Sequence, residues 1–151
     1  MGGRYTSEKI RPLLYKAIKN HITEYGANTY YIGHRGNFDR MCMGVLKELK
    51  EKYPSIMLYL VEPYALSQPN AEAPKGFTLF YPEIEKVPLK LAIVQANRYM
   101  VQHSDYLVIC PSAVGNSRRL LEFAQRREKK GLIKVTVIEN FENSQSLCIT
   151  L

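Results

Sequence analysis

The chain has 151 residues, of which 46% are hydrophobic and 23% are charged. This composition excludes a disordered chain and predicts one domain over residues 1–151 with a buried core. The formal net charge of +7 favours an anionic partner such as nucleic acid, a nucleotide or another phosphorylated molecule. The alternative is that the protein is basic but has no anionic partner.

The three cysteines, Cys42, Cys110 and Cys148, lie far apart and lack the spacing of a zinc site or a disulfide framework. The histidines show no metal-ligand spacing either, so we expect neither a metal nor a cofactor. The sequence has no apolar run long enough for a membrane span and no apolar signal region at its start. We therefore expect a cytoplasmic protein that does not bind membranes.

The first part of the chain alternates helix and strand patterns. Apolar residues recur at helical spacing over 7–25 and predict a helix that Gly26 would cap. The run 29–32 is short, β-branched and aromatic, as in a buried strand. A second amphipathic helix is expected from about residue 38 to residue 53, where Pro54 follows. The nearly continuous apolar run 56–61 predicts a strand buried on both faces, as in a parallel sheet.

The segment 62–87 interrupts this pattern, because prolines punctuate it, and it predicts a long loop. Phe77, Phe80 and Tyr81 lie in this segment and favour a functional lid over a disordered loop. Regular patterns then resume. We expect a helix over 89–102, a strand over 106–110, a turn over 111–117, a helix with an exposed basic face over 118–130, a strand over 134–138 and a possible last strand over 145–151.

Alternating helices and strands with short connections predict an α/β domain with a mainly parallel sheet. Ligands of such sheets bind at the carboxyl ends of the strands, and two glycine-containing turns lie there, at 33–39 and at 111–117. In the first turn, Gly33 and Gly36 allow close approach, and the amides that open the next helix carry a partial positive charge. We expect both turns to face one crevice that binds a phosphate-like anion.

Several short motifs occur in a characteristic order. They are Gly33-x-x-Gly36-x-Phe38-Asp39, Leu46-Lys47-Glu48-Leu49, Tyr53-Pro54, Asn97-Arg98-Tyr99-Met100-Val101-x-x-Ser104-Asp105, and Gly115-x-Ser117 leading to Leu121-Glu122-Phe123-Ala124. Together they resemble the YpsA-like branch of the SLOG superfamily, which also contains the DNA-processing protein A and Lonely Guy families. The resemblance covers most of the chain, from residue 4 to about residue 138.

The resemblance implies a Rossmann-like three-layer sandwich with a pocket for a nucleotide or a nucleotide-derived ligand. Relatives of the DNA-processing type bind single-stranded DNA in the corresponding region, and Lonely Guy relatives hydrolyse cytokinin nucleotides. This sequence lacks the P-G-G-x-G-T-x-x-E arrangement of the Lonely Guy proteins over 111–122, which argues against that hydrolysis.

The N-terminus also departs from the family pattern. Its members typically begin with an apolar strand that ends in a Gly-His-Arg-like turn, whereas here only Gly2-Gly3-Arg4 precedes the first helix. We therefore expect the usual first strand to be missing, with the apolar run 146–151 as a strand that replaces it. The alternatives for this run are an edge hairpin with the strand over 134–138, or a frayed tail.

The candidate ligand-binding residues come from both turns and from the end of the helix over 89–102. They are Gly33, Gly36, Asp39, Asn97, Arg98, Gly115, Asn116 and Ser117. Asp39 either caps its helix or orients a ribose hydroxyl or a neighbouring arginine. Asn97 and Arg98 either satisfy local carbonyls or, in the case of Arg98, bind a phosphate.

The sequence supports no set of catalytic residues. No Ser-His-Asp or Cys-His arrangement can be assigned, and Glu122 is the single carboxylate that we considered as a general base. Our leading hypothesis is a binding or sensing module for a nucleotide-like small molecule. The second hypothesis is a single-stranded nucleic-acid binder that uses the basic helix and the aromatics of 62–87, and the weakest is a nucleotide-processing hydrolase. A homo-oligomer is left open.

Overall fold

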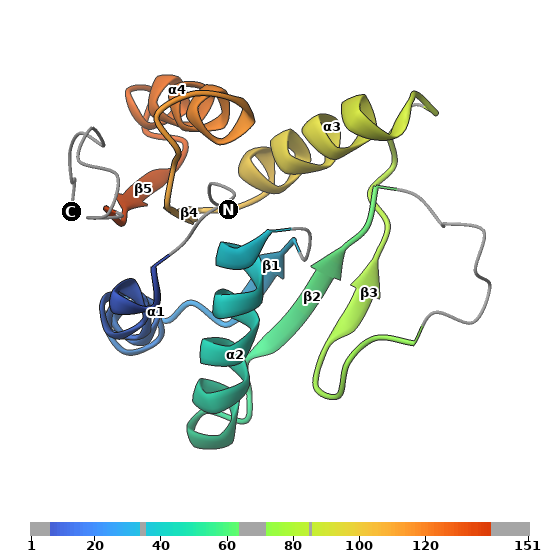
Figure 1. Cartoon of the computed structure of the whole chain (residues 1–151). Coiled ribbons are helices and arrows are strands. Elements are labelled where there is room, and N and C mark those ends of the chain that lie inside the picture. Colours follow the sequence, from blue (N-terminus) through green and yellow to red (C-terminus); the bar gives the residue numbers. More distant parts are fainter. Residues whose placement is uncertain (1–6, 34–35, 64–71, 85, 140–151) are drawn as a thin grey trace.

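The computed structural model describes residues 7–33, 36–63, 72–84 and 86–139, which form layers of helices around parallel strands (Figure 1). In chain order the elements are η1 Glu8–Ile10, α1 Arg11–Thr23, β1 Thr29–Ile32, α2 Asn37–Lys52, β2 Met57–Val61, β3 Thr78–Phe80, α3 Leu89–Gln102, β4 Tyr106–Ile109, α4 Asn116–Glu128 and β5 Lys134–Val137. The α/β class and the parallel strands that the sequence predicts are confirmed.

The strands form two sheets rather than one. β1, β2 and β3 pair in that order, with Leu60 opposite both Ile32 and Leu79. β4 and β5 pair separately, with Val108 opposite Thr136. Every one of these pairings is parallel.

The two sheets run in the same direction and face each other through β1 and β4. At the amino ends of the strands, the rings of Tyr25 and Tyr106 stack with their centroids 5.2 Å apart. At the carboxyl ends, Ile32, Cys110 and Ile138 belong to one buried cluster. Both ends of β1 therefore lie near the matching ends of β4.

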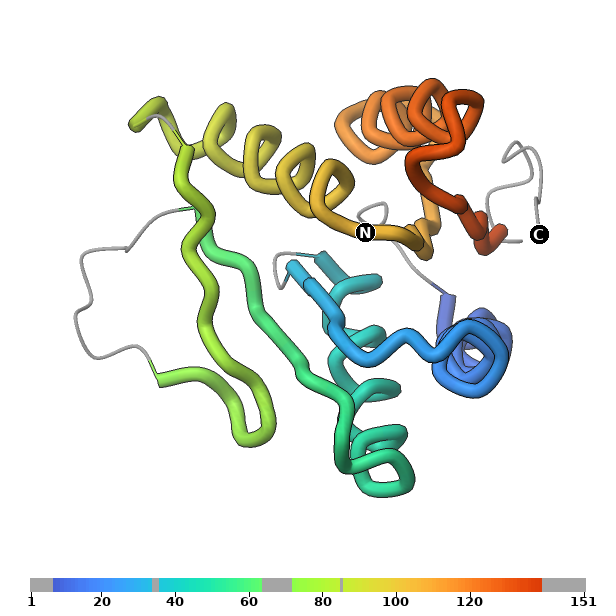
Figure 2. Tube along the Cα trace, turned by 180° about the vertical axis from the view of Figure 1, so that it is seen from behind, coloured from blue at the N-terminus to red at the C-terminus, as the bar shows by residue number. Residues whose placement is uncertain are grey.

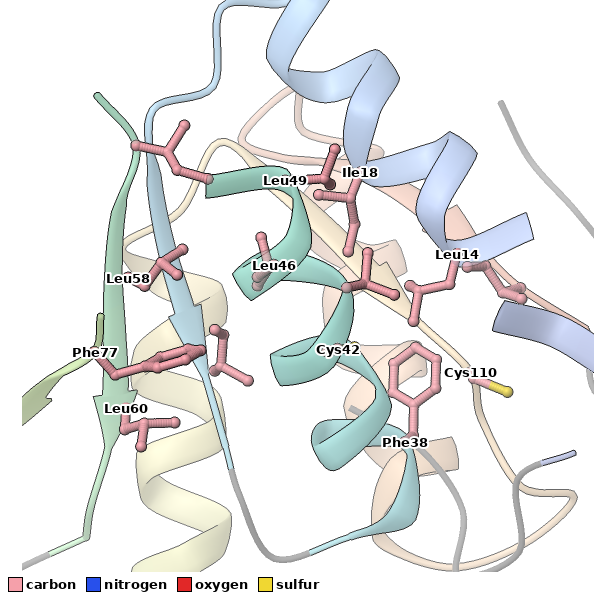
Figure 3. Close-up of a cluster of buried hydrophobic side chains, with 14 of the residues drawn as sticks. Leu14, Ile18, Phe38, Cys42, Leu46, Leu49, Leu58, Leu60, Phe77 and Cys110 are labelled. Carbon is pink, nitrogen blue, oxygen red and sulfur yellow. The ribbon is translucent and has the colours of Figure 1, made fainter. Parts of the chain in front are cut away.

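Helices cover both faces of the strands. Figures 1 and 2 show α1 and α2 together on one side and α3 and α4 on the other. Leu14 and Ile18 of α1 pack with Leu46 and Leu49 of α2 in a cluster that reaches Leu58 of β2 (Figure 3). The sequence encodes this packing as apolar residues that recur every three or four positions along each helix. This arrangement is the three-layer, Rossmann-like sandwich expected from the sequence.

The end of α1 follows the prediction for Gly26. Its backbone has a φ of 66°, in the left-handed region that glycine adopts without strain. The amide of Ala27 donates to the carbonyl of His21 at 2.9 Å, which closes the last turn of the helix. The chain then reverses toward β1.

The prediction of one long loop over 62–87 is wrong for its second half, because β3 lies there. Phe77 is buried in the same cluster as Leu58 and Leu60, and the Phe80 ring lies tilted against Tyr99 of α3 with ring centroids 5.8 Å apart. Pairing with β2 overrides the proline-rich local sequence. Phe77 and Phe80 therefore support the sheet and do not form a free aromatic lid.

Other boundaries shift only slightly. β2 begins at Met57, one residue later than expected, and β4 and β5 each end one residue earlier. The described part of the chain begins at Ser7, directly before η1, so the expected loss of the first strand concerns residues outside it. The predicted strand over 145–151 lies outside the described residues. No helix in the part of the chain described here is long and apolar enough to cross a bilayer.

Candidate functional site

A cavity of about 650 Å³ lies between the facing edges of β1 and β4. One side is closed by α1 and α2 through Ile18, Cys42 and Leu46, and the other by α3 through Met100 and Val101. The cavity runs along the strands from Tyr25 and Tyr106, at their amino ends, to Gly33 and Asp39, at their carboxyl ends. It therefore extends to the carboxyl edge, where parallel sheets bind ligands.

The turn between β1 and α2 is shaped around Asp39. A Cβ atom on Gly33 would lie 3.0 Å from Oδ2 of Asp39, tighter than nine in ten real Cβ contacts, so the carboxylate would have to move by a few tenths of an ångström. Gly36 is the N-cap of α2 in extended backbone, and a Cβ atom there would lie at an ordinary 3.6 Å from the same oxygen. The carboxylate thus occupies the turn beside the positive end of the α2 dipole. Gly33, Gly36 and Asp39 lie together in this turn, and their part in ligand binding stays a prediction from the sequence.

The turn between β4 and α4 has the opposite electrostatic character. Gly115 is its N-cap with a φ of 98°, and the first turn of α4 contains no acid. Ser117 Oγ accepts from the amide of Ser112 at 3.0 Å, and the two hydroxyls lie 2.8 Å apart. Ser112 Oγ in turn donates to the carbonyl of Val114 at 2.6 Å. These bonds close the loop around an exposed Asn116 at the start of the helix.

The positive charge of the α4 terminus is reinforced by its neighbours in the chain. Arg118 and Arg119 directly follow Ser117 in the first turn of α4. Because Gly115 has no side chain, no N-cap side chain accepts hydrogen bonds from the first amides of the helix. An anion is therefore favoured at this terminus more than at the terminus of α2.

The two turns are neighbours in space. Phe38, at the start of α2, and Cys110, at the end of β4, are packed in one buried cluster and lie at the same end of it (Figure 3). Burial raises the pKa of the Cys42 thiol to about 12, and the charges of Asp39 and Cys110 act in the same direction. Within the described residues, however, the cavity lining includes Gly33 and Asp39 but does not extend to Gly115, Asn116 or Ser117.

The buried thiols are not suited to nucleophilic chemistry. Burial raises the pKa of the Cys110 thiol to about 11, so this group, like Cys42, stays protonated at neutral pH. Both cysteines are free rather than disulfide-bonded. The thiol is a weak nucleophile compared with the thiolate, so neither group is an activated nucleophile.

Arg98 and Asn97 lie apart from the two turns in the structure. Arg98 is exposed on α3, and its guanidinium carbon lies 5.4 Å from the ring centroid of Phe123 on α4. Neither Asn97 nor Arg98 belongs to the described lining of the cavity. Their part in ligand binding stays a prediction from the sequence.

Glu122 lies on the exposed side of α4 and likewise does not line the described cavity. No group of three or more histidine, cysteine or acidic side chains in the described ranges is placed to hold a metal ion.

His21 is a lining residue that the sequence analysis did not select. It is 5% exposed, and its Nδ1 lies 2.6 Å from the carbonyl of Ala17, which requires a proton on Nδ1. Its Nε2 atom is buried and has no hydrogen-bond partner among the described residues. In the sequence, His21 occupies a position on the predicted apolar face of the first helix. A polar residue at such a position is the signal that could have identified it.

Comparisons with known proteins assign no family. No protein-family model matches the chain, and no curated protein matches it.

Proposed function

We propose that the chain is a binding or sensing module for a nucleotide or a nucleotide-derived ligand, which binds at the carboxyl edge of the parallel strands. The observation that carries this proposal is a pair of neighbouring helix starts with different charges. Asp39 lies at the start of α2, whereas α4 begins with no acid and with two arginines in its first turns. A ligand with a polar sugar at one end and a phosphate at the other matches this pair.

The two helix starts have different roles in the proposal. The carboxylate of Asp39 is an acceptor for ribose hydroxyls, a role that an acidic residue farther along the chain, about twenty residues after the glycine motif, has in dinucleotide-binding folds. The amides of Asn116 and Ser117, with Arg118 and Arg119 beside them, bind the phosphate. The net charge of +7 attracts such a ligand over longer distances.

The test changes the charge at the start of α4, where the phosphate is proposed to bind, and keeps the shape of the side chain. Asn116→Asp replaces an exposed amide by an isosteric carboxylate at the first position of α4. We expect at least a tenfold loss in affinity for adenosine monophosphate, measured by calorimetry, and little change for adenosine, which lacks the phosphate. The fold is expected to be kept, because an acid is favourable at a helix N-terminus.

The matched control is Asn20→Asp, which makes the same substitution at an exposed position of α1. It should leave both affinities unchanged. If Asn116→Asp bound the nucleotide as tightly as the unchanged chain does, the phosphate site would lie elsewhere. If the chain bound oligo-dT but no mononucleotide, and the affinity fell steeply with salt, the single-stranded nucleic-acid hypothesis would replace this proposal.

A further inference from the structure

Three aromatic rings in mutual contact line the amino end of the cavity between β1 and β4. His21 of α1 lies edge-to-face against Tyr25 and Tyr106, with ring centroids 5.4 Å and 5.3 Å apart. The two tyrosine rings stack on each other. All three residues line the cavity, and His21 is the most deeply buried of the described polar residues that do so. The two tyrosines therefore fix the orientation of a buried histidine at this end.

The hydrogen bonding of His21 makes its second ring nitrogen an acceptor. The Nδ1 atom lies 2.6 Å from the carbonyl of Ala17 and donates to it. In the neutral ring, Nε2 then has a lone pair and no proton. This Nε2 atom is buried and has no partner among the described residues. Buried polar atoms are nearly always hydrogen-bonded, so its partner is either a water molecule or a donor group of a bound ligand.

The size and the walls of the cavity favour a ligand over a single water. The cavity measures about 650 Å³, whereas one water occupies roughly 30 Å³ and small-molecule sites roughly 300–1,000 Å³. Apolar side chains line it from both helix layers, with Cys42 and Leu46 of α2 on one side and Met100 and Val101 of α3 on the other. A flat ring with apolar faces and polar edges fits between such walls, and a nucleobase has this shape.

The length of the cavity matches that of a nucleoside. Along β1 the lining runs from Thr29 to Gly33, which corresponds to about 13 Å. Gly33 lies next to Asp39, the proposed ribose acceptor. His21 lies at the other end, beside Tyr106, the first residue of β4. A purine nucleoside with a hydrogen bond at each end has about this length, so the 6-position of its base reaches His21.

We propose that the cavity binds the base of an adenine nucleotide, whose 6-amino group donates to Nε2 of His21. This inference rests on the proposed function, because the ribose and the phosphate keep their places at Asp39 and at the start of α4. The 6-amino group of adenine is a donor, whereas the 6-oxygen of guanine is an acceptor and would face the lone pair of Nε2. His21 is therefore the residue that selects adenine over guanine.

Two nucleotides and two variants of the full chain test this contact by calorimetry. Adenosine monophosphate should bind about tenfold more tightly than purine riboside 5′-monophosphate, which lacks the 6-amino group and leaves Nε2 unpaired. His21→Phe keeps a ring against Tyr25 and Tyr106 but removes Nε2, so it should bind the two nucleotides with affinities within about twofold of each other.

The matched control is His103→Phe. His103 also lines the cavity, and its Nδ1 lies 2.9 Å from the carbonyl of Tyr99, four residues earlier, but its side chain is exposed. This variant should keep the preference for adenosine monophosphate. Loss of the preference in His103→Phe but not in His21→Phe would overturn the proposal.

Nuclear magnetic resonance of the imidazole nitrogens gives a second measurement, which does not depend on the folding of a variant. Adenosine monophosphate should shift the Nε2 resonance of His21 in the unchanged chain, and purine riboside 5′-monophosphate should shift it much less. If the chain bound no purine nucleotide, the proposed function would fail together with this inference. If both nucleotides bound equally tightly, or if adenosine monophosphate left the Nε2 resonance unmoved, the proposed function would stand and the role of His21 would be overturned.

Discussion

The role of Arg98 cannot be deduced from its residue type alone. An arginine near a helix end suits a phosphate site, and the sequence analysis assigned it there. In the structure its guanidinium carbon lies 5.4 Å from the Phe123 ring centroid, and Arg127 lies 6.0 Å from the same ring. The Phe123 ring of α4 therefore contacts α3 through Arg98, whereas Arg127 belongs to α4 itself. Sequence spacing between residues 98 and 123 gives no indication of this contact.

The substitution Arg98→Ala distinguishes a packing role of Arg98 against Phe123 from a role in ligand binding. Loss of the cation–π contact should lower the free energy of unfolding by about 0.5–1 kcal/mol, the range for exposed pairs. A double-mutant cycle with Phe123→Leu, measured by urea unfolding, isolates the coupling between the two residues. Nucleotide affinity is measured on the same variants. A tenfold loss of affinity with no coupling to Phe123 would assign Arg98 to the ligand site.

Among the elements, α1 connects the two sheets. Leu14 of α1, together with Ile10 of the preceding η1, shares one buried cluster with Leu58 of the first sheet and with Cys110 and Ile138, which flank the second. The helix therefore lies across the gap between β1 and β4. Its apolar stripe was evident from the sequence, but what the stripe covers depends on the positions of the strands.

Leu14→Ala should be strongly destabilising for this reason. Leu14 is 0% exposed, and removal of a fully buried leucine side chain costs about 2–5 kcal/mol of unfolding free energy. The adjacent Leu13 is 46% exposed, so Leu13→Ala is a matched control that should change the stability by less than about 0.5 kcal/mol. Chemical unfolding of both variants measures the difference. Equal effects would show that α1 does not hold the sheets together.

Some helices and strands could be predicted from local sequence patterns alone, and others could not. The helices α2 and α3 follow their predicted ranges closely, because apolar periodicity over three or four turns is a strong local signal. β3 was missed because it has three residues and depends on pairing with β2, which is distant in sequence. The gap between the sheets has no local signal at all.

At the scale of the whole molecule, stability should fall in alkaline solution. Burial raises the pKa of Cys42 to about 12, of Cys110 to about 11 and of Tyr30 to about 12. The unfolded chain therefore loses these protons first, from about pH 9 upward. The stabilisation by each group is complete below its unfolded pKa and is lost as the pH rises through its folded pKa.

Urea unfolding at pH 8 and at pH 10.5 measures this effect. We expect a lower free energy of unfolding at the higher pH, with each group adding at most about 1.4 kcal/mol per pH unit. Cys42→Ala removes one of the three groups and should make the decline shallower. A decline of the same steepness in both proteins would show that the Cys42 thiol does not contribute.

The contact of Tyr25 with Tyr106 has a practical consequence for spectroscopy. The chain contains eleven tyrosines and no tryptophan, so tyrosines dominate its near-ultraviolet circular dichroism. Tyr25 and Tyr106 are stacked at an interplanar angle of 17°, and Lys134 donates to the Tyr25 hydroxyl at 3.0 Å. Each ring comes from a different side of the gap, next to β1 and in β4. Separation of the two halves of the molecule would break this stack, so it should change the tyrosine band, to which all eleven tyrosines contribute.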